Sequence, residues 1–147
     1  MYKMLVPLDG SEVALCVIPQ VKAITDGWKT CEVILLHVVE TPPTWVMENK
    51  GMRESHAAEE KKSKEYLSEI QSQIIAKGMT VTTEVLVGNA AETIINYTKE
   101  KQVDFLVMTT HVSSALSQLV FGSVSNKVMR CSGVPVLMVT PSTVKCK

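Results

Sequence analysis

The chain has 147 residues, 46% of them hydrophobic and 20% charged, a composition typical of one globular domain with a substantial core. Fifteen basic residues balance fifteen acidic ones, which excludes the basic excess of nucleic-acid-binding proteins, and no apolar run reaches the roughly 20 residues that span a membrane. The four cysteines and three histidines are scattered without metal-binding spacing, so we expect reduced thiols in a cytoplasmic protein and no metal site.

The N-terminal part of the chain predicts a strand followed by a helix. Residues 2–8 form an apolar run, and Asp9-Gly10-Ser11 interrupts it. With Ser11 as a possible N-cap, apolar residues at helical spacing predict a helix to about Thr25. We expect a kink at Pro19, because an interior proline costs a helix about 3 kcal/mol.

The middle of the chain predicts two further strands around a long helix. Residues 32–39, EVILLHVV, are apolar on both faces, which indicates a central strand. Residues 40–52 contain prolines and a glycine and predict an irregular segment. A charged run followed by an apolar stripe predicts a helix over residues 53–77, ended by Gly78, with a solvated first half. Residues 79–87 alternate only partly, which suits an edge strand.

The last third of the chain predicts a helix, a buried strand and a polar loop. Asn89 stands three residues before Glu92, the spacing of a capping box at a helix start. The apolar run 105–108 then indicates a buried strand. A loop rich in Ser and Thr follows over residues 109–117, at the position where α/β proteins bind ligands.

The segment after this loop predicts a helix and a final strand. Gly122-Ser123 opens a helical pattern that runs to Cys131, and the uncharged run Val134 to Val139 predicts the last strand. The free N–H groups and the dipole at a helix N-terminus favour an anion such as phosphate.

The alternation of five strands with four helices predicts an α/β fold, a three-layer sandwich with a five-stranded parallel sheet. We expect one domain over residues 1–141 and a short tail over 142–147. Periodicity alone does not give the order of the strands.

Residues 109–123 resemble the nucleotide loop of the universal stress protein family, which reads Gly, two residues, Gly, nine residues, Gly, then Ser or Thr. Gly122-Ser123 matches the end of this motif at the family's spacing, whereas Thr109 and Val112 replace its first two glycines. The resemblance implies an adenine nucleotide alpha hydrolase-like fold with strand order 3-2-1-4-5. In that order the first and fourth strands are neighbours at the point where ligands bind in open α/β sheets.

The resemblance also implies a ligand, ATP or AMP, with Mg²⁺ as a possible companion, and a role in stress-linked regulation through a protein partner. Asp9 matches the contact to adenine and ribose, although it could instead only cap the following helix, and Val38 matches the backbone contact to adenine. The positions that match the family's nucleotide site are Pro7, Leu8, Asp9, Val38, Met108, Thr109, Thr110, Val112, Gly122, Ser123, Val124 and Ser125.

No catalytic residue is predicted. The chain has no Gly-Lys-Ser/Thr phosphate loop and no Ser-x-Gly elbow or Cys/His pair that would supply a nucleophile. We therefore expect at most slow ATP hydrolysis.

The two missing glycines leave two functions open. Val112 at a position that needs positive φ would cost about 1–3 kcal/mol, and each lost charge-assisted hydrogen bond about 1.5–3 kcal/mol. Such losses would turn micromolar binding into millimolar binding. The chain is then either a nucleotide-binding regulatory protein with a degenerate glycine motif, or a universal stress protein that binds no nucleotide and acts as a dimeric interaction module.

The last predicted strand suggests a homodimer. An uncharged apolar edge such as Val134 to Val139 is prone to aggregate unless another segment covers it or pairs with it. Pairing with a second copy about a two-fold axis is the simplest closed arrangement. The alternative is a monomer in which residues 40–52 cover this edge.

Overall fold

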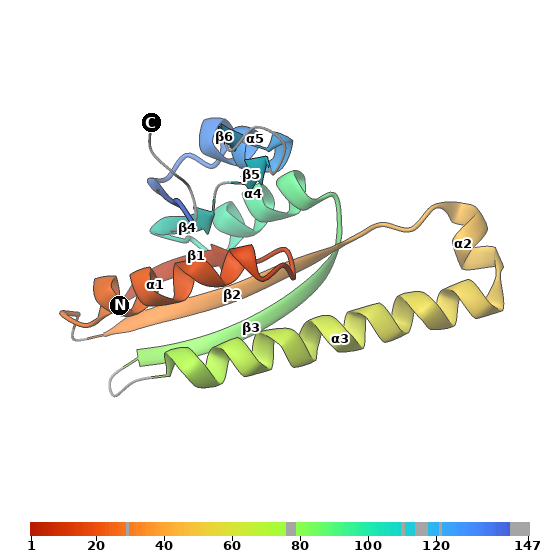
Figure 1. Ribbon diagram of the computed structural model, residues 1–147, viewed down its shortest axis with the longest axis horizontal. Helices are drawn as coiled ribbons and strands as arrows, with labels where there is room; N and C mark the ends of the chain where they lie inside the picture. Colours follow the sequence, from red (N-terminus) through yellow and green to blue (C-terminus); the bar gives the residue numbers. More distant parts are fainter. Residues whose placement is uncertain (29, 76–78, 110, 114–117, 121, 142–147) are drawn as a thin grey trace.

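The computed structural model describes residues 1–28, 30–75, 79–109, 111–113, 118–120 and 122–141. Its centre is a five-stranded sheet in the order β3-β2-β1-β4-β7, in which every neighbouring pair is parallel (Figure 1). The strands are β1 (Tyr2–Pro7), β2 (Cys31–Glu40), β3 (Met79–Gly88), β4 (Phe105–Thr109) and β7 (Val136–Val139). This arrangement confirms the α/β class and the strand order 3-2-1-4-5.

Helices cover both faces of the sheet. They are the 3₁₀ helix η1 (Val13–Cys16), α1 (Val17–Thr25), α2 (Thr44–Glu48), α3 (Lys50–Ile74), α4 (Ala90–Glu100) and α5 (Ser123–Cys131). One core cluster joins the sheet to α1 and α3, and the other joins it to α4 and α5. The predicted three layers are therefore present.

The inner strand β2, which lies between β3 and β1, contributes to both cores. Val33 and Leu35 lie in the cluster with α1 and α3, whereas Ile34 and Leu36 lie in the cluster with α4 and α5. All four side chains are buried, because side chains of a strand alternate between the two faces of a sheet. The apolar run 32–39 is thus a strand buried on both sides, as predicted.

The first helix differs from the prediction at its start. The chain forms η1 first, and α1 begins only at Val17, with Cys16 as an N-cap that makes no side-chain hydrogen bond. Pro19 therefore lies in the first turn of α1, where the backbone N–H groups have no intrahelical acceptor, and the expected kink in the middle of a helix is wrong. Ser11 is not the N-cap of α1.

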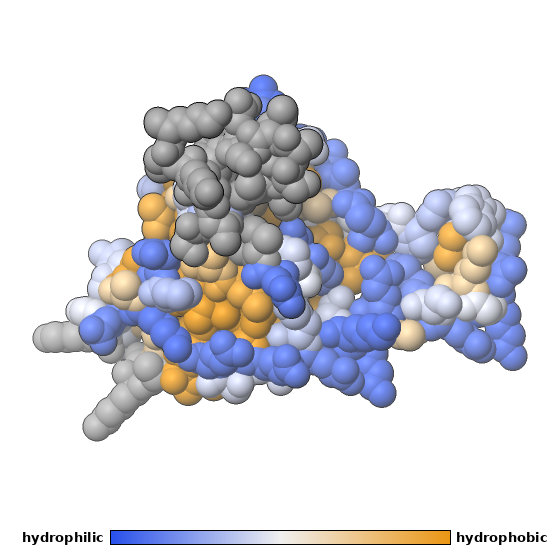
Figure 2. Space-filling model, in the orientation of Figure 1, coloured by the Kyte–Doolittle hydropathy of each residue, from blue (hydrophilic) through white to orange (hydrophobic). Residues whose placement is uncertain are grey.

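Residues 40–52 are mostly helical, so the predicted irregular segment is wrong. They contain α2 and the start of α3, and the side chain of Asn49 accepts a hydrogen bond from the N–H of Met52 at 3.2 Å, which caps α3. α2 and the adjoining half of α3 project beyond the end of the sheet (Figure 1). Figure 2 shows apolar surface on this projecting part, where Trp45 and Met47 are exposed.

The long helix α3 is anchored only by its second half. Its buried residues are Ser63, Leu67, Ile70 and Ile74. The helix ends at Ile74, three residues before the predicted end, and the predicted stop at Gly78 lies outside the described residues. The charged first half is exposed, as its composition indicated.

The segment predicted as a polar loop contains strands. β5 (His111–Ser113) and β6 (Gln118–Val120) pair antiparallel, with Val112 opposite Leu119. Short antiparallel pairing gives the backbone groups of these residues partners within the segment. The loop prediction for residues 109–117 is therefore wrong where β5 lies.

Three other boundaries follow the sequence closely. The side chain of Asn89 accepts a hydrogen bond from the N–H of Glu92 at 3.1 Å and caps α4. α5 begins at Ser123 and ends at Cys131, as predicted. β7 begins at Val136, two residues later than predicted, and the carbonyl of Pro135 accepts a hydrogen bond from Leu106 N–H at 3.0 Å.

Candidate functional site

The carboxyl ends of β1 and β4 open into one cavity. These strands are neighbours, with Leu5 opposite Leu106, so the residues that follow them reach the same edge of the sheet. Eight of the twelve predicted site residues line a cavity of about 120 Å³ at this edge. They are Pro7, Leu8, Asp9, Val38, Met108, Thr109, Val124 and Ser125.

Of the other four predicted site residues, Gly122 and Ser123 are described and do not line this cavity. Gly122 is the N-cap of α5 and Ser123 its first residue, directly before two residues that do line it. The backbone of Val112 lies in β5, and its side chain lies outside the described residues, as does all of Thr110. The ligand-binding roles of all twelve positions stay predictions.

The cavity has an apolar floor and one carboxylate. Leu8 from the turn after β1, Leu36 from β2 and Met108 from β4 form this floor, and each is at most 5% exposed. Asp9 is the one charged side chain among its lining residues. Such a cavity suits a flat, weakly polar ring that presents hydrogen-bond donors at its edge.

The turn that carries Asp9 is held by hydrogen bonds from several elements. Leu8 N–H donates to Leu36 O at 2.8 Å, and His37 Nδ1 donates to Leu8 O at 2.7 Å, which assigns the ring proton to Nδ1. The backbone N–H and the hydroxyl of Ser11 both donate to Asp9 Oδ1, at 2.9 and 2.5 Å. These contacts fix where the Asp9 carboxylate lies.

Tyr66 of α3 ties the same turn to the helix layer. Its hydroxyl donates to Ser11 O at 3.1 Å. Burial, with the negative charge of Asp9 as a smaller cause, raises the pKa of Tyr66 to about 12. Neither His37 nor Tyr66 was predicted from the sequence; the signal for His37 was a polar residue within the otherwise apolar run 33–39.

Two further cavities adjoin the turn on the α3 side of β2. One, of about 580 Å³, lies between the end of β2, α2 and α3, and the acidic and aromatic residues along it are Asp9, His37, Glu40, Trp45, His56 and Glu59. The other, of about 240 Å³, shares Asp9, His37 and Glu59 and adds Lys62 and Tyr66. Neither cavity was predicted, because residues 40–52 were expected to be irregular and the charged first half of the helix over residues 53–77 to be solvated.

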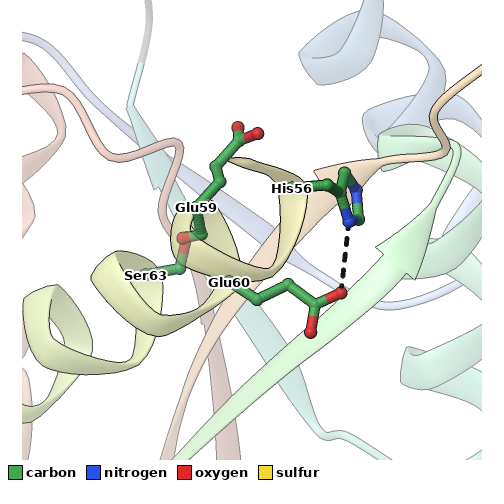
Figure 3. A network of polar contacts seen from close by, with 4 residues as sticks. All are labelled: His56, Glu59, Glu60 and Ser63. Atoms are coloured by element: carbon green, nitrogen blue, oxygen red, sulfur yellow. Dashed lines mark hydrogen bonds and ion pairs between the residues drawn. The ribbon is translucent and has the colours of Figure 1, made fainter. Parts of the chain in front are cut away.

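Two polar contacts lie along α3, the helix that forms one side of both cavities. His56 Nδ1 lies 3.5 Å from Glu60 Oε1, one helical turn away, and Ser63 Oγ donates to Glu59 O at 3.0 Å (Figure 3). The second ring nitrogen of His56, Nε2, is buried and has no hydrogen-bond partner among the described residues. The charged groups of this wall are mainly carboxylates.

The N-terminus of α5 lies beside the first cavity. Gly122 and Ser123 begin the helix, and Val124 and Ser125 line the cavity from its first turn. A helix N-terminus carries roughly half a positive charge and presents free N–H groups. This end of the cavity can therefore accept an anionic group.

No helix in the described part of the chain is long and apolar enough to cross a membrane.

Comparison with known proteins shows which protein family this chain is similar to. The model of the universal stress protein family matches residues 1–140. The universal stress protein MJ0577 of Methanocaldococcus jannaschii is 30% identical, over 93% of each chain, and its solved structure superposes with a TM-score of 0.80 over 95% of each chain.

Two more distant structures share the fold. A universal stress protein in complex with cAMP is 21% identical, with a TM-score of 0.65 over 96% of this chain and 98% of that one. A family member from Arabidopsis thaliana with AMP bound is 17% identical, with a TM-score of 0.64 over 97% of this chain and 94% of that one. The chain belongs to the universal stress protein family.

Proposed function

We propose that this chain is a regulatory protein that binds an adenine nucleotide between the carboxyl ends of β1 and β4. The observation that carries the proposal is the cavity in which eight of the predicted site residues meet. The apolar floor suits the base, and the Asp9 carboxylate suits donors on its edge or on the ribose. The cAMP and AMP found in two relatives support this class of ligand.

The replaced glycines predict weak binding. Thr109 ends β4 and lines the cavity, and Val112 lies in β5; in the family's motif both positions are glycines of the nucleotide loop. Glycine at these positions would allow a closer approach of the backbone to a phosphate. We expect dissociation constants between micromolar and millimolar for the natural sequence.

Calorimetric titration with AMP tests the proposal. The variant Thr109→Gly/Val112→Gly should bind AMP more tightly than the natural sequence, by about tenfold if one good hydrogen bond is regained. Asp9→Asn removes the charge in the cavity and should weaken binding in both backgrounds. Absence of heat with the natural chain and the glycine variant alike would defeat the proposal.

Among the described residues β7 is an edge strand of the sheet, which favours a second proposal, a homodimer that pairs β7 with its copy. β7 is the last strand of the sheet, and Leu137 is 45% exposed. Residues 40–52 were the alternative segment that could cover the β7 edge. They form α2 and the start of α3, and α2 contacts α3. The homodimer would allow this chain to act as a cytoplasmic, dimeric interaction module. This function does not require that a nucleotide binds.

A further inference from the structure

We infer that His37 and Tyr66 are positioning residues for the nucleotide site, which hold the turn after β1 and thereby fix where the Asp9 carboxylate meets the ligand. The inference rests on the proposed adenine-nucleotide function and adds two residues to it. Both residues act from the α3 side of the sheet, whereas residues of α4 and α5 line the nucleotide cavity.

The turn after β1 needs support because it lies at the surface. Asp9 and Gly10 are exposed, and Gly10 has no side chain that could pack against a neighbour. An exposed segment with few buried apolar contacts is held mainly by its hydrogen bonds to adjoining elements. The position of the Asp9 carboxylate therefore depends on those bonds.

Strand β2 holds the start of the turn through two neighbouring residues. Leu8 N–H donates to Leu36 O at 2.8 Å, and His37 Nδ1 donates to Leu8 O at 2.7 Å. Both backbone groups of Leu8 are thus bound by β2, directly before Asp9. The second of these bonds comes from a side chain, so it is lost when residue 37 has no donor.

Helix α3 holds the other end of the turn through Tyr66. The Tyr66 hydroxyl donates to Ser11 O at 3.1 Å, and Ser11 donates through its N–H and its hydroxyl to Asp9 Oδ1. A continuous series of contacts therefore runs from α3 through Ser11 to the carboxylate. Burial raises the pKa of Tyr66 to about 12, so its hydroxyl keeps the donated proton at neutral pH.

Neither residue lines the nucleotide cavity. Among the described residues, those around the cavity between β1 and β4 include Leu8 and Asp9 but not His37 or Tyr66. His37 and Tyr66 line a cavity on the α3 side instead. Their effect on nucleotide affinity must therefore pass through the turn.

Titration of the full chain with AMP, followed by NMR chemical shifts, tests the inference in the natural sequence and in the Thr109→Gly/Val112→Gly background. His37→Leu removes the donor and should weaken AMP binding about tenfold, the effect of losing one good hydrogen bond. His37→Asn keeps an N–H donor near the position of Nδ1 and should bind AMP within about threefold of its parent.

A matched pair of tyrosine variants tests the contact from α3. Tyr66→Phe should weaken AMP binding about threefold, because its longer hydrogen bond to Ser11 is lost. Tyr97 of α4 is also buried, but its hydroxyl makes no hydrogen bond to the turn among the described residues. Tyr97→Phe should therefore leave AMP affinity unchanged.

An Asp9→Ala background separates positioning from a general effect on folding. Because His37 acts through the Asp9 carboxylate, His37→Leu should change AMP affinity less than about twofold once that carboxylate is removed. A purely structural role would weaken AMP binding by the same factor in both backgrounds. Nitrogen NMR at about pH 8 gives an independent readout, in which the ring proton of His37 should be on Nδ1.

The possible failures are distinct. AMP affinities of His37→Leu and Tyr66→Phe equal to that of their parent would overturn the inference and leave the proposed function standing. Equal losses with and without Asp9→Ala, or a ring proton on Nε2, would do the same. If His37→Leu does not fold, Tyr66→Phe with and without Asp9→Ala gives the same decision. Absence of AMP binding to the natural chain and the glycine variant alike would overturn the proposed function and the inference with it.

Discussion

Gly10 is the position where the backbone of the site is most sensitive to a single methyl group. Its φ is +85°, in the left-handed region, and it directly follows Asp9. A Cβ at this position would lie 3.7 Å from His37 Cε1, an ordinary contact. The cost of Gly10→Ala is therefore the backbone conformation alone and not a steric clash.

Two opposing contributions determine how much Gly10→Ala changes the free energy of unfolding. An L-residue in the left-handed region costs about 1–2 kcal/mol, and alanine gains back about 0.4–1 kcal/mol by restricting the unfolded chain. We expect Gly10→Ala to lower the free energy of unfolding by about 1 kcal/mol. For a chain of this size that corresponds to a melting temperature about 2–4 °C lower.

Urea denaturation and calorimetry of Gly10→Ala beside Gly27→Ala provide the assay. Gly27 is not in the left-handed region, and a methyl group added there would have no described atom within 4 Å, so alanine should be neutral or slightly stabilising. AMP affinity should fall only in Gly10→Ala, because the turn carries Asp9. Equal unfolding midpoints for the two variants would refute the reasoning.

Three further predictions concern a helix cap, a buried phenol and the sheet edge. Asn89→Ala should cost about 1 kcal/mol in urea denaturation, because the side chain caps α4 through the N–H of Glu92. The pKa of Tyr66 is about 12 in the folded chain and near 10 when unfolded, so its contribution to stability is complete below pH 10 and is lost towards pH 12. Met138→Pro removes a backbone donor from the side of β7 that faces away from β4, because Leu106 N–H bonds to Pro135 O and the parallel ladder therefore turns Leu137 N–H towards β4. It should shift a dimer to monomer or aggregate in light scattering.

Each of these has a result that would count against it. Asn89→Asp keeps a capping oxygen and should retain stability, so a loss as large as that of the alanine variant would remove the capping explanation. Tyr66→Phe should flatten the decline in stability above pH 10, and an unchanged decline would assign it to other groups. An unchanged, soluble dimer from Met138→Pro would place the interface elsewhere.

Local sequence determined most of the elements. Apolar runs identified every strand of the main sheet, because a buried strand needs apolar side chains on one or both faces whatever its neighbours are. The start of α4 was also readable, since the Asn89 cap uses an N–H only three residues away. The strand order and the twelve site positions came from the resemblance of residues 109–123 to a known nucleotide loop, not from periodicity.

Local signals were insufficient where an element has no distinctive pattern. α2 has no buried residue, and residues 40–52 were predicted to be irregular because they contain prolines and a glycine. Pro19 indicated a kink only because the helix was expected to begin earlier than it does. β5 and β6 are three residues each, too short for a reliable alternation.

Tertiary structure alone decided how the site is assembled. Parallel pairing of β1 with β4 brings Asp9, Val38 and Ser125, which are distant in the sequence, to one cavity. The same packing places Tyr66 of α3 and His37 of β2 against the turn after β1. These contacts depend on which strands become neighbours and which helix covers each face, and such long-range choices are set by the burial of the whole core rather than by any short stretch of the chain.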